Sequence, residues 1–199
     1  TSNSSNFISA IGNITGEQFK TQLRQEFVDM QNSVLRYGGF YIGRYETGNL
    51  SQTKAVVQKN NTDINNQNWH VQYNKCKTIA EGTQGTTSMI WGCQWDATMN
   101  WFLESSDSEV VEYVTDSTGK GNYSANKIPT GSNNNYSVNK IYDMAGNVWD
   151  WTLEADNTYM RVVRRRHTAI LVLTLQFLIA IASIQVTATP AMVAVQHFM

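Results

Sequence analysis

The segment 141–152, with the sequence IYDMAGNVWDWT, constrains the fold more than any other part of this 199-residue chain. The dipeptide Gly146-Asn147 at its centre predicts a turn, because glycine and asparagine adopt a positive φ at low cost. In the extended stretch that follows, Trp149 and Trp151 alternate with small or polar residues and therefore share one face of a strand. Two buried indoles contribute much of a small core. The segment therefore predicts a strand whose tryptophans anchor the core.

An amphipathic helix is predicted near the N-terminus, after a polar segment over residues 1–14 that reads as disordered or as a linker. Thr15 and Gln18 have the spacing of a capping box, with Thr15 as the N-cap. Gly38-Gly39 ends the helix, which should cover about residues 16–36. Its apolar face repeats at helical spacing: Phe19, Leu23, Phe27, Met30 and Val34.

The rest of the chain predicts short elements separated by long polar stretches. Aromatic and β-branched residues favour a strand over 40–45, followed by a polar loop over 48–70. A short helix near 70–81 and a helix from about Gln94 come next, and one face of the second holds three large side chains: Trp95, Met99 and Phe102. The stretch 105–137 is rich in Ser, Asn, Gly and Thr. Long loops of this kind either carry a binding surface or have little order.

Charge and composition exclude some classes of partner. The formal net charge is −1 and charged residues make up 16% of the chain. Proteins that bind nucleic acid or anionic membranes usually present a strongly basic surface, so no nucleic-acid partner is expected. The uncharged polar surface suits a polar ligand or another protein surface. Arg44 and Glu46 could pair with each other, but solvated side chains are the preferred interpretation.

Three blocks of sequence together resemble the sulfatase-modifying-factor family, whose members have the fold of the formylglycine-generating enzyme. The blocks are residues 39–46 (GFYIGRYE), 90–97 (IWGCQWDA) and 141–152. The third is nearly the family signature Y-D-M-x-G-N-V-W-E-W-T, and residues 161–164 (RVVR) are similar to the R-V-x-R that follows it. The first two blocks are weak singly, and the third carries the resemblance.

The resemblance implies an α+β fold of the C-type-lectin-like kind, rich in loops, with residues 15–163 forming an incomplete domain. The family's final strands are absent from the expected place, and residues 164–199 form an apolar tail without family features. Loss of those strands would leave an unpaired sheet edge and exposed indoles. Bacterial and phage proteins with this variant resemble surface-displayed modules, which implies an extracellular location or a phage particle.

A structural calcium site is the one metal site that the resemblance implies for residues present in this chain. In the family a calcium ion often sits at the signature segment. Carried over, its ligands would be the main-chain carbonyls of Gly146 and Val148 and the carboxylate of Asp150. All are hard oxygen donors of the type that calcium prefers. The family has glutamate where this chain has Asp150, one methylene shorter.

The catalytic metal sites of the family find no counterpart in this sequence. Formylglycine-generating members bind copper through two cysteines in the C-terminal third, whereas Cys76 and Cys93 precede the signature segment. They could form one disulfide or remain two inert thiols. A related branch uses three histidines for iron, but the histidines here are scattered without ligand spacing: His70, His167 and His197. No copper or iron site and no catalytic residue are therefore predicted.

The tail after Arg164 supports two interpretations. Residues 169–186 are long and apolar enough for a transmembrane helix, and an arginine cluster precedes them. The preferred interpretation is a shifted reading frame that begins between Arg164 and His167. Regrouping the back-translated codons permits Y-S-N-T-G-S-N-S-P-x-x-Y-R-N and then, at the chain's end, G-x-R-P-A-L-Y. Both strings match the missing end of the family in the correct order. The expected tail is then poorly defined or an isolated helix.

Three functions follow from these features. The first is a non-catalytic module that binds a ligand or a surface through long loops on a rigid scaffold. The second is a metal-dependent oxidase that converts a sulfatase cysteine to formylglycine, which is the activity of family members with the copper cysteines. The third is a membrane-anchored protein, if the apolar tail is genuine.

Overall fold

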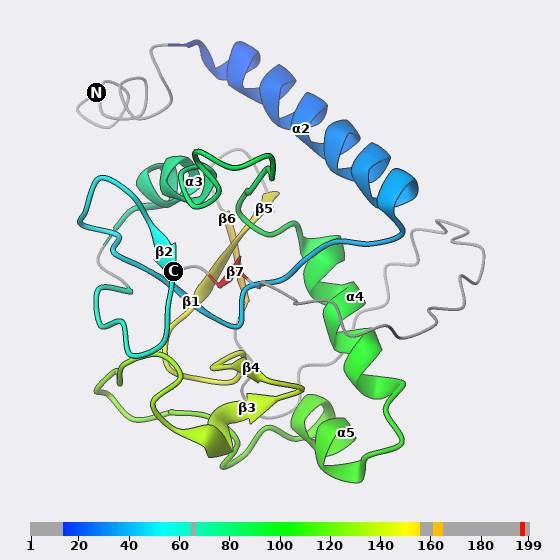
Figure 1. The fold of residues 1–199 in the computed structure, drawn as a ribbon, viewed down its shortest axis with the longest axis vertical. Helices are drawn as coiled ribbons and strands as arrows, with labels where there is room; N and C mark the ends of the chain where they lie inside the picture. The colour runs from blue at the N-terminus through cyan, green and yellow to red at the C-terminus, as the bar shows by residue number, and fades with distance from the viewer. Residues whose placement is uncertain (1–13, 65–66, 156–160, 165–195, 198–199) are drawn as a thin grey trace. The chain divides into compact units, whose positions relative to one another are not determined.

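The computed structural model describes residues 14–64, 67–155, 161–164 and 196–197. These residues combine helices with small sheets, an α+β composition that agrees with the predicted class at this coarse level. The chain divides into two compact units. Of the described residues, 14–41 belong to the first unit, and 42–64, 67–155, 161–164 and 196–197 belong to the second. Figure 1 shows the elements in chain order.

Helix α2 (Gly16–Tyr37) is the described element of the first unit, and its predicted ends are confirmed. The backbone N–H of Gln18 donates to Thr15 Oγ1 at 3.2 Å, and Thr15 N–H donates to Gln18 Oε1 at 2.7 Å. Gly38 adopts φ +77° and caps the C-terminus through its N–H, which donates to the carbonyl of Val34. The predicted apolar face is the less exposed one, with these side chains buried or half-buried: Phe19, Leu23, Phe27, Met30 and Val34.

The first sheet of the second unit is built on β1 (Tyr45–Gly48). It pairs antiparallel with β2 (Val56–Val57) and parallel with β7 (Gln196–His197). The predicted strand over 40–45 is wrong, because only its last residue belongs to β1. Aromatic and β-branched residues favour extended backbone, but a strand also needs a partner. The pairing with β2 places Thr47 opposite Val57, beyond the predicted segment.

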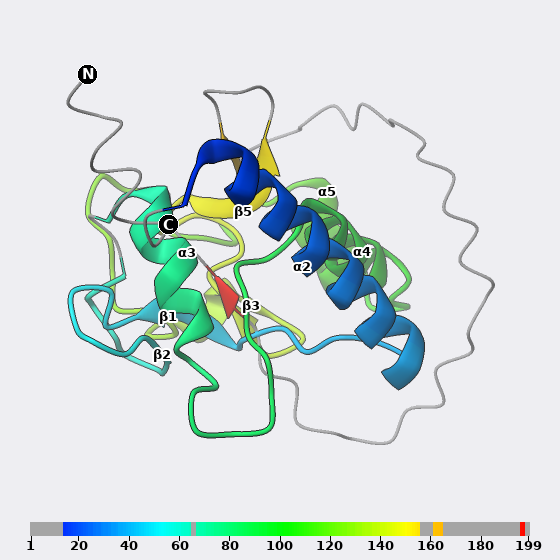
Figure 2. The same cartoon turned by 90° about the horizontal axis from the view of Figure 1, so that it is seen from above.

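Two helices lie on either side of β5 (Asp150–Ala155), as Figures 1 and 2 show. The indole N–H of Trp69, in α3 (Trp69–Lys77), donates to the carbonyl of Thr152 at 2.9 Å. On the other side Leu153 N–H donates to the carbonyl of Ile90, just before α4 (Gly92–Leu103). Both predicted helices are confirmed, and the expected face of α4 is buried: Trp95, Met99 and Phe102.

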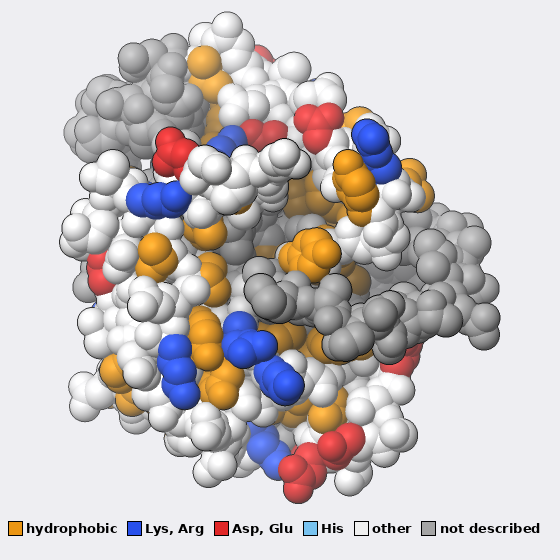
Figure 3. All heavy atoms as spheres, viewed as in Figure 1, with side chains coloured by type: hydrophobic (Ala, Val, Ile, Leu, Met, Phe, Trp, Pro, Cys, Tyr) orange, Lys and Arg blue, Asp and Glu red, His pale blue; other side chains and the backbone are white. Residues whose placement is uncertain are grey.

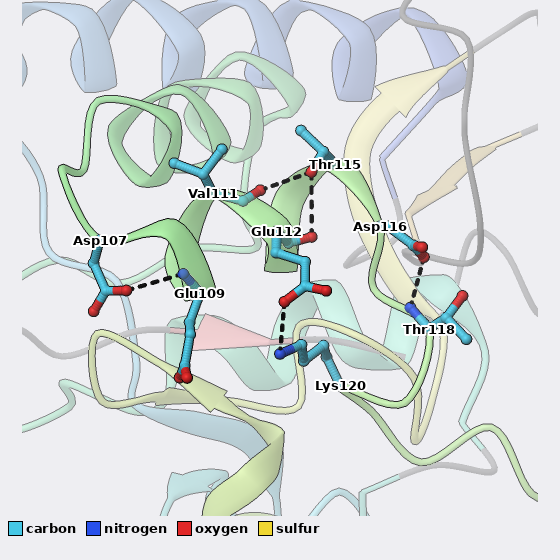
Figure 4. Close-up of polar contacts among 8 residues, drawn as sticks. All are labelled: Asp107, Glu109, Val111, Glu112, Thr115, Asp116, Thr118 and Lys120. Carbon is cyan, nitrogen blue, oxygen red and sulfur yellow. Dashed lines mark hydrogen bonds and ion pairs between the residues drawn. The ribbon is translucent and has the colours of Figure 1, made fainter.

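The polar stretch 105–137 contains regular structure that the sequence analysis did not predict. Helix α5 (Ser108–Thr115) begins at Asp107, whose carboxylate accepts from the N–H of Glu109 at 2.9 Å (Figure 4). Val110, Tyr113 and Val114 are its buried side chains. A single helical turn η1 (Asn134–Tyr136) follows later in the stretch. The prediction of one long loop is therefore wrong for these segments.

A tight hairpin joins β3 (Ser137–Val138) to β4 (Ile141–Tyr142). Asn139 and Lys140 form its two-residue loop, with φ values of +48° and +65°. Positive φ at both loop positions is the mark of a type I′ turn, which matches the twist of paired strands.

The expectation that both tryptophans anchor the core is wrong, and so is the unpaired sheet edge that was expected to expose them. Trp149 is 50% exposed and Trp151 is half-buried, whereas the side chains of Asp150 and Thr152 are fully buried. The two-residue period is correct, but the small and polar face points to the core. β5 is paired with β6 (Arg161–Arg164), so the strand has an antiparallel partner.

Most of the predicted apolar tail lies outside the described residues, including the candidate span 169–186 and the site of the proposed frame change. Of this tail the structure describes Arg164, the last residue of β6, and the two residues of β7, which pairs with β1. For these residues the expected poorly defined or helical tail is wrong. Among the helices that are described, none is both long and apolar enough to cross a membrane.

Candidate functional site

A buried hydrogen-bond network surrounds the turn that the signature segment predicts. Asn147 Nδ2 donates to Glu46 Oε2 at 2.7 Å and to the carbonyl of Ile128 at 3.1 Å. Asn147 Oδ1 accepts from Ile128 N–H at 2.9 Å and from Asn122 Nδ2 at 3.1 Å. Both amide hydrogens and both acceptor positions are therefore used. One side chain ties β1 to two segments of the long polar stretch.

Gly146 is required at this turn for two reasons. Its φ is +82°, which favours glycine, and the backbone of Asn122 passes directly beside it. A Cβ at position 146 would lie 2.5 Å from the carbonyl oxygen of Asn122. The N–H of Asn147 donates to that same oxygen at 2.6 Å, so the close approach is part of the network.

A second branch of the network runs through Thr130 and Asp143. The N–H of Glu46 donates to Thr130 Oγ1 at 3.0 Å, and that hydroxyl donates to Asp143 Oδ2 at 2.9 Å. Gly131 N–H donates to the same carboxylate oxygen at 2.7 Å. Asp143 is fully buried and accepts both bonds from a segment twelve or more residues away.

Glu46 is the electrostatic centre of the network, contrary to the expectation that it would be solvated. Its side chain is 1% exposed, and within the described residues its Oε1 atom has no hydrogen-bond partner. Burial raises the pKa of this carboxyl well above its ordinary value, and the charges of Asp143 and Asp150 raise it further. The hydrogen bond from Asn147 acts in the opposite direction. Folding therefore shifts the equilibrium of this carboxyl toward its neutral form relative to the unfolded chain.

The three residues predicted to bind calcium are buried next to this network in the sequence segment that contains its central turn. Gly146, Val148 and Asp150 are all buried, and the charge of Asp150 reaches Glu46. Within the described residues no three histidine, cysteine, aspartate or glutamate side chains are placed to hold a metal ion together. A cation here would consequently need main-chain carbonyls, as the predicted set contains. The charges of Asp143 and Asp150 both act on the buried carboxyl of Glu46, and a cation beside these groups would offset that repulsion.

The cysteines are two free thiols, one of the two arrangements left open by the sequence. Cys76 is fully buried in α3, where its Sγ donates to the carbonyl of Gln72. Burial raises the pKa of both thiols, most strongly that of Cys76. Cys93 lies near the start of α4 and is exposed. Since the thiolate is the metal ligand and nucleophile, both environments favour the inert form.

The three histidines lie in different segments of the chain. His70 lies in α3, with its ring edge-on to Trp69 at 5.1 Å between centroids. His197 takes part in β7 through its backbone. His167 lies outside the described residues.

A pair of stacked tyrosines lies on the surface beside the buried network. The rings of Tyr45 and Tyr142 are 5.1 Å apart between centroids with an interplanar angle of 28°. Lys59 Nζ lies 5.9 Å from the centroid of the Tyr142 ring, within cation–π distance. Tyr142 N–H donates to the carbonyl of Arg44, and Lys140 lies two residues before Tyr142. We call these five residues the tyrosine–cation surface.

The cations of the tyrosine–cation surface are exposed and carry no ion pair within the described part of the chain: Arg44, Lys59 and Lys140. Figure 3 shows basic side chains gathered over the region of β1 and β4, with apolar side chains between them. The acidic side chains closest to them in that view lie lower, at α5. The surface is therefore a locally positive region on a chain of net charge −1.

Sequence reasoning missed most of this site. It placed Gly146, Val148 and Asp150 in the turn region but did not connect them with Glu46 or Asp143. One signal was available, since a glutamate in an aromatic and β-branched stretch, here between Tyr45 and Thr47, can point inward. The tyrosine pairing carried no signal, because Tyr45 and Tyr142 lie far apart in the sequence.

Comparison with protein-family models, with curated proteins and with solved structures finds no match for this chain.

Proposed function

We propose that the chain is a formylglycine-generating-enzyme-like domain, of the C-type-lectin-like fold, that acts as a non-catalytic binding module. The observation that carries the binding role is the tyrosine–cation surface. Exposed cations without ion pairs beside half-buried aromatic rings are typical of recognition surfaces. The fold assignment rests on the signature segment 141–152. Its glycine, Gly146, lies too close to the Asn122 backbone for a Cβ, and its asparagine, Asn147, donates to buried Glu46.

The buried network supports this role by fixing the backbone beneath the surface. Tyr45 directly precedes Glu46, and the Tyr45 ring packs against Gly131, where a Cβ would lie 2.4 Å from a ring carbon. Gly131 in turn donates its N–H to buried Asp143. A preorganised surface loses less conformational entropy on binding than a flexible one.

The environments of the cysteines favour the binding role over the oxidase. Copper chemistry of the family's kind needs thiolates, whereas burial raises the pKa of Cys76 and Cys93. Thiols held in the protonated form suit a structural role.

We also propose a structural calcium ion held by the carbonyls of Gly146 and Val148 and by Asp150. When bound, the ion would supply positive charge to the buried carboxyl group and so rigidify the turn. We expect added calcium to raise the melting temperature, because a ligand that binds only the folded state stabilises it. Magnesium should do so less, since it loses its hydration shell reluctantly.

Two variants test this calcium site in differential scanning calorimetry. Asp150→Asn should lose the calcium-dependent increase in melting temperature. Asp29→Asn, the same charge change on the exposed face of α2, should retain it. Equal shifts in both variants and in the wild type would show that calcium acts elsewhere on the chain.

The binding role is tested by presenting the immobilised chain with a panel of neutral and charged polymers. Binding to at least one polymer, with the polymer recovered unchanged, is the expected result. Failure to bind any polymer would contradict the proposal.

A further inference from the structure

We propose that the tyrosine–cation surface binds an acidic glycan, a sugar polymer that carries carboxylate or sulfate groups. This inference rests on the proposed binding role and names the ligand class for that surface. Two features of the surface support it, the positive charges without ion pairs and the neutral hydrogen-bonding groups beside them, and the charge of the whole chain argues against other polyanions.

The first feature is the unpaired charge. Arg44, Lys59 and Lys140 present three positive charges without an ion pair in the described residues. A single exposed ion pair contributes little, typically under about 1 kcal/mol. A polymer with repeated anionic groups can engage several cations in one binding event, so the contributions combine. A polyanion therefore fits this surface better than a small anion does.

The second feature is the set of neutral polar groups beside the cations. The phenol of Tyr142 donates to Asn134 Oδ1 at 3.1 Å, and the Asn134 side chain is exposed in η1. An amide and a phenol can both donate and accept hydrogen bonds. Sugar hydroxyls have the same dual character, whereas the ionised side chains of an acidic peptide only accept hydrogen bonds. The combination favours an anionic ligand that is also rich in hydroxyl groups.

The charge of the whole chain argues against nucleic acid and membranes. Nucleic-acid and anionic-membrane binding rely on many phosphate contacts over a basic surface, whereas this chain has a net charge of −1. In the view of Figure 3 the positive region is local, and acidic side chains lie at other positions on the same face. A local positive region suits spaced carboxylates or sulfates along a sugar chain.

The test measures binding of the whole chain to four soluble polymers and to single-stranded DNA by biolayer interferometry at low and moderate salt. The polymers are polygalacturonate, dextran sulfate, neutral dextran and poly-glutamate. We expect binding to polygalacturonate, to dextran sulfate or to both, weakening with salt, and none to dextran. The first two polymers distinguish carboxylate from sulfate as the recognised group.

A pair of double variants locates the site. K59Q/K140Q should weaken glycan binding by about tenfold, the effect of losing two exposed ion pairs. K20Q/K120Q makes the same change in net charge at lysines paired with acids outside the surface, and should leave binding within about twofold. Y142F keeps the aromatic ring but removes its hydroxyl group, and should also weaken binding. Urea unfolding midpoints verify that each variant is folded.

Several outcomes would overturn the inference. Equal loss in both double variants would indicate a general charge effect. Equal binding of poly-glutamate or DNA would show that the sugar is irrelevant. Binding to neutral dextran that K59Q/K140Q leaves intact would preserve the binding role but place it elsewhere. Absence of binding to any of the polymers would contradict both proposals.

Discussion

At position 147 both the backbone conformation and the side-chain hydrogen bonds favour asparagine. Its φ is +54°, a conformation that asparagine tolerates better than most residues, and its amide makes four hydrogen bonds. Aspartate has the same shape but cannot donate, so it would face Glu46 Oε2 as a second acceptor. Gly146 beside it is specified by the proximity of the Asn122 backbone.

We expect Gly146→Ala to lower the free energy of unfolding by more than the cost of its positive φ alone. Strained backbone costs about 1–3 kcal/mol, and the clash with Asn122 adds to that. Gly119→Ala is the matched control, because Gly119 has φ +74° but no atom within 4 Å of its Cβ position. Urea denaturation of both variants separates the two contributions. Equal losses would contradict the close approach described at Gly146.

Single residues also show where prediction from sequence failed. The alternation of Trp149 and Trp151 gave the correct two-residue period, but period alone does not say which face is buried. Indoles bury more apolar area than any other side chain, so the core was the natural expectation. Here the other face is buried, since Asp150 belongs to the polar network and Thr152 accepts from Trp69 through its carbonyl.

At the scale of elements, local signals predicted helices well when the cap and the apolar period agreed. The capping box of Thr15 and Gln18 fixed the start of α2, and Gly38 its end. Helix α5 was missed because the sequence around it is polar and its period covers only two turns. Its signal was Asp107 as N-cap, followed by the buried residues Val110 and Val114.

Loss of the Thr15 cap should destabilise the first turn of α2. We expect Thr15→Ala to cost about 1 kcal/mol and to increase amide exchange at Gln18, which loses its acceptor. Thr15→Ser keeps the hydroxyl and should behave as the wild type. Hydrogen exchange measured by NMR distinguishes this local fraying from global unfolding. Unchanged protection at Gln18 in the alanine variant would show that the cap contributes nothing.

The strands required information that no local stretch contains. The predicted strand over 40–45 had suitable residues, but β1 lies at 45–48, where partners are present. The pairing of β5 with β6 likewise depends on residues six to fourteen positions apart. Propensity marks extended backbone, and the fold decides which part of it becomes a strand.

At the scale of the whole molecule, the buried acid predicts how stability depends on pH. The pKa of Glu46 is raised in the folded state, so the folded state binds a proton more tightly than the unfolded state. Stability is therefore greatest below the ordinary pKa of 4.5 as far as this group is concerned, and it falls as pH rises through the folded-state value.

Glu46→Gln should reduce this dependence, since the amide keeps an oxygen that can accept from Asn147 but has no charge. We expect the variant to be at least as stable as the wild type at neutral pH, with a smaller decrease in stability above pH 4.5. Urea unfolding at a series of pH values provides the measurement. Parallel curves for both proteins would assign the dependence to other groups.

The sequence analysis correctly predicted the mixed α+β composition and the central turn, but it did not predict the contacts that join distant segments. The bond from Asn147 to Glu46 spans 101 residues, and the bond from Trp69 to Thr152 spans 83. Such pairings depend on the complete chain path, which a pattern of apolar and polar residues does not encode.

The span of that network has a consequence for how the protein matures on the ribosome. Glu46 emerges about a hundred residues before Asn147, and closing so long a loop is slow and entropically costly. Until Asn147 leaves the exit tunnel, Glu46 lacks the amide that donates to its carboxyl group in the folded protein. The second unit should therefore acquire protease resistance late and in one step, and nascent chains that end before Asp143 should stay sensitive to cleavage throughout.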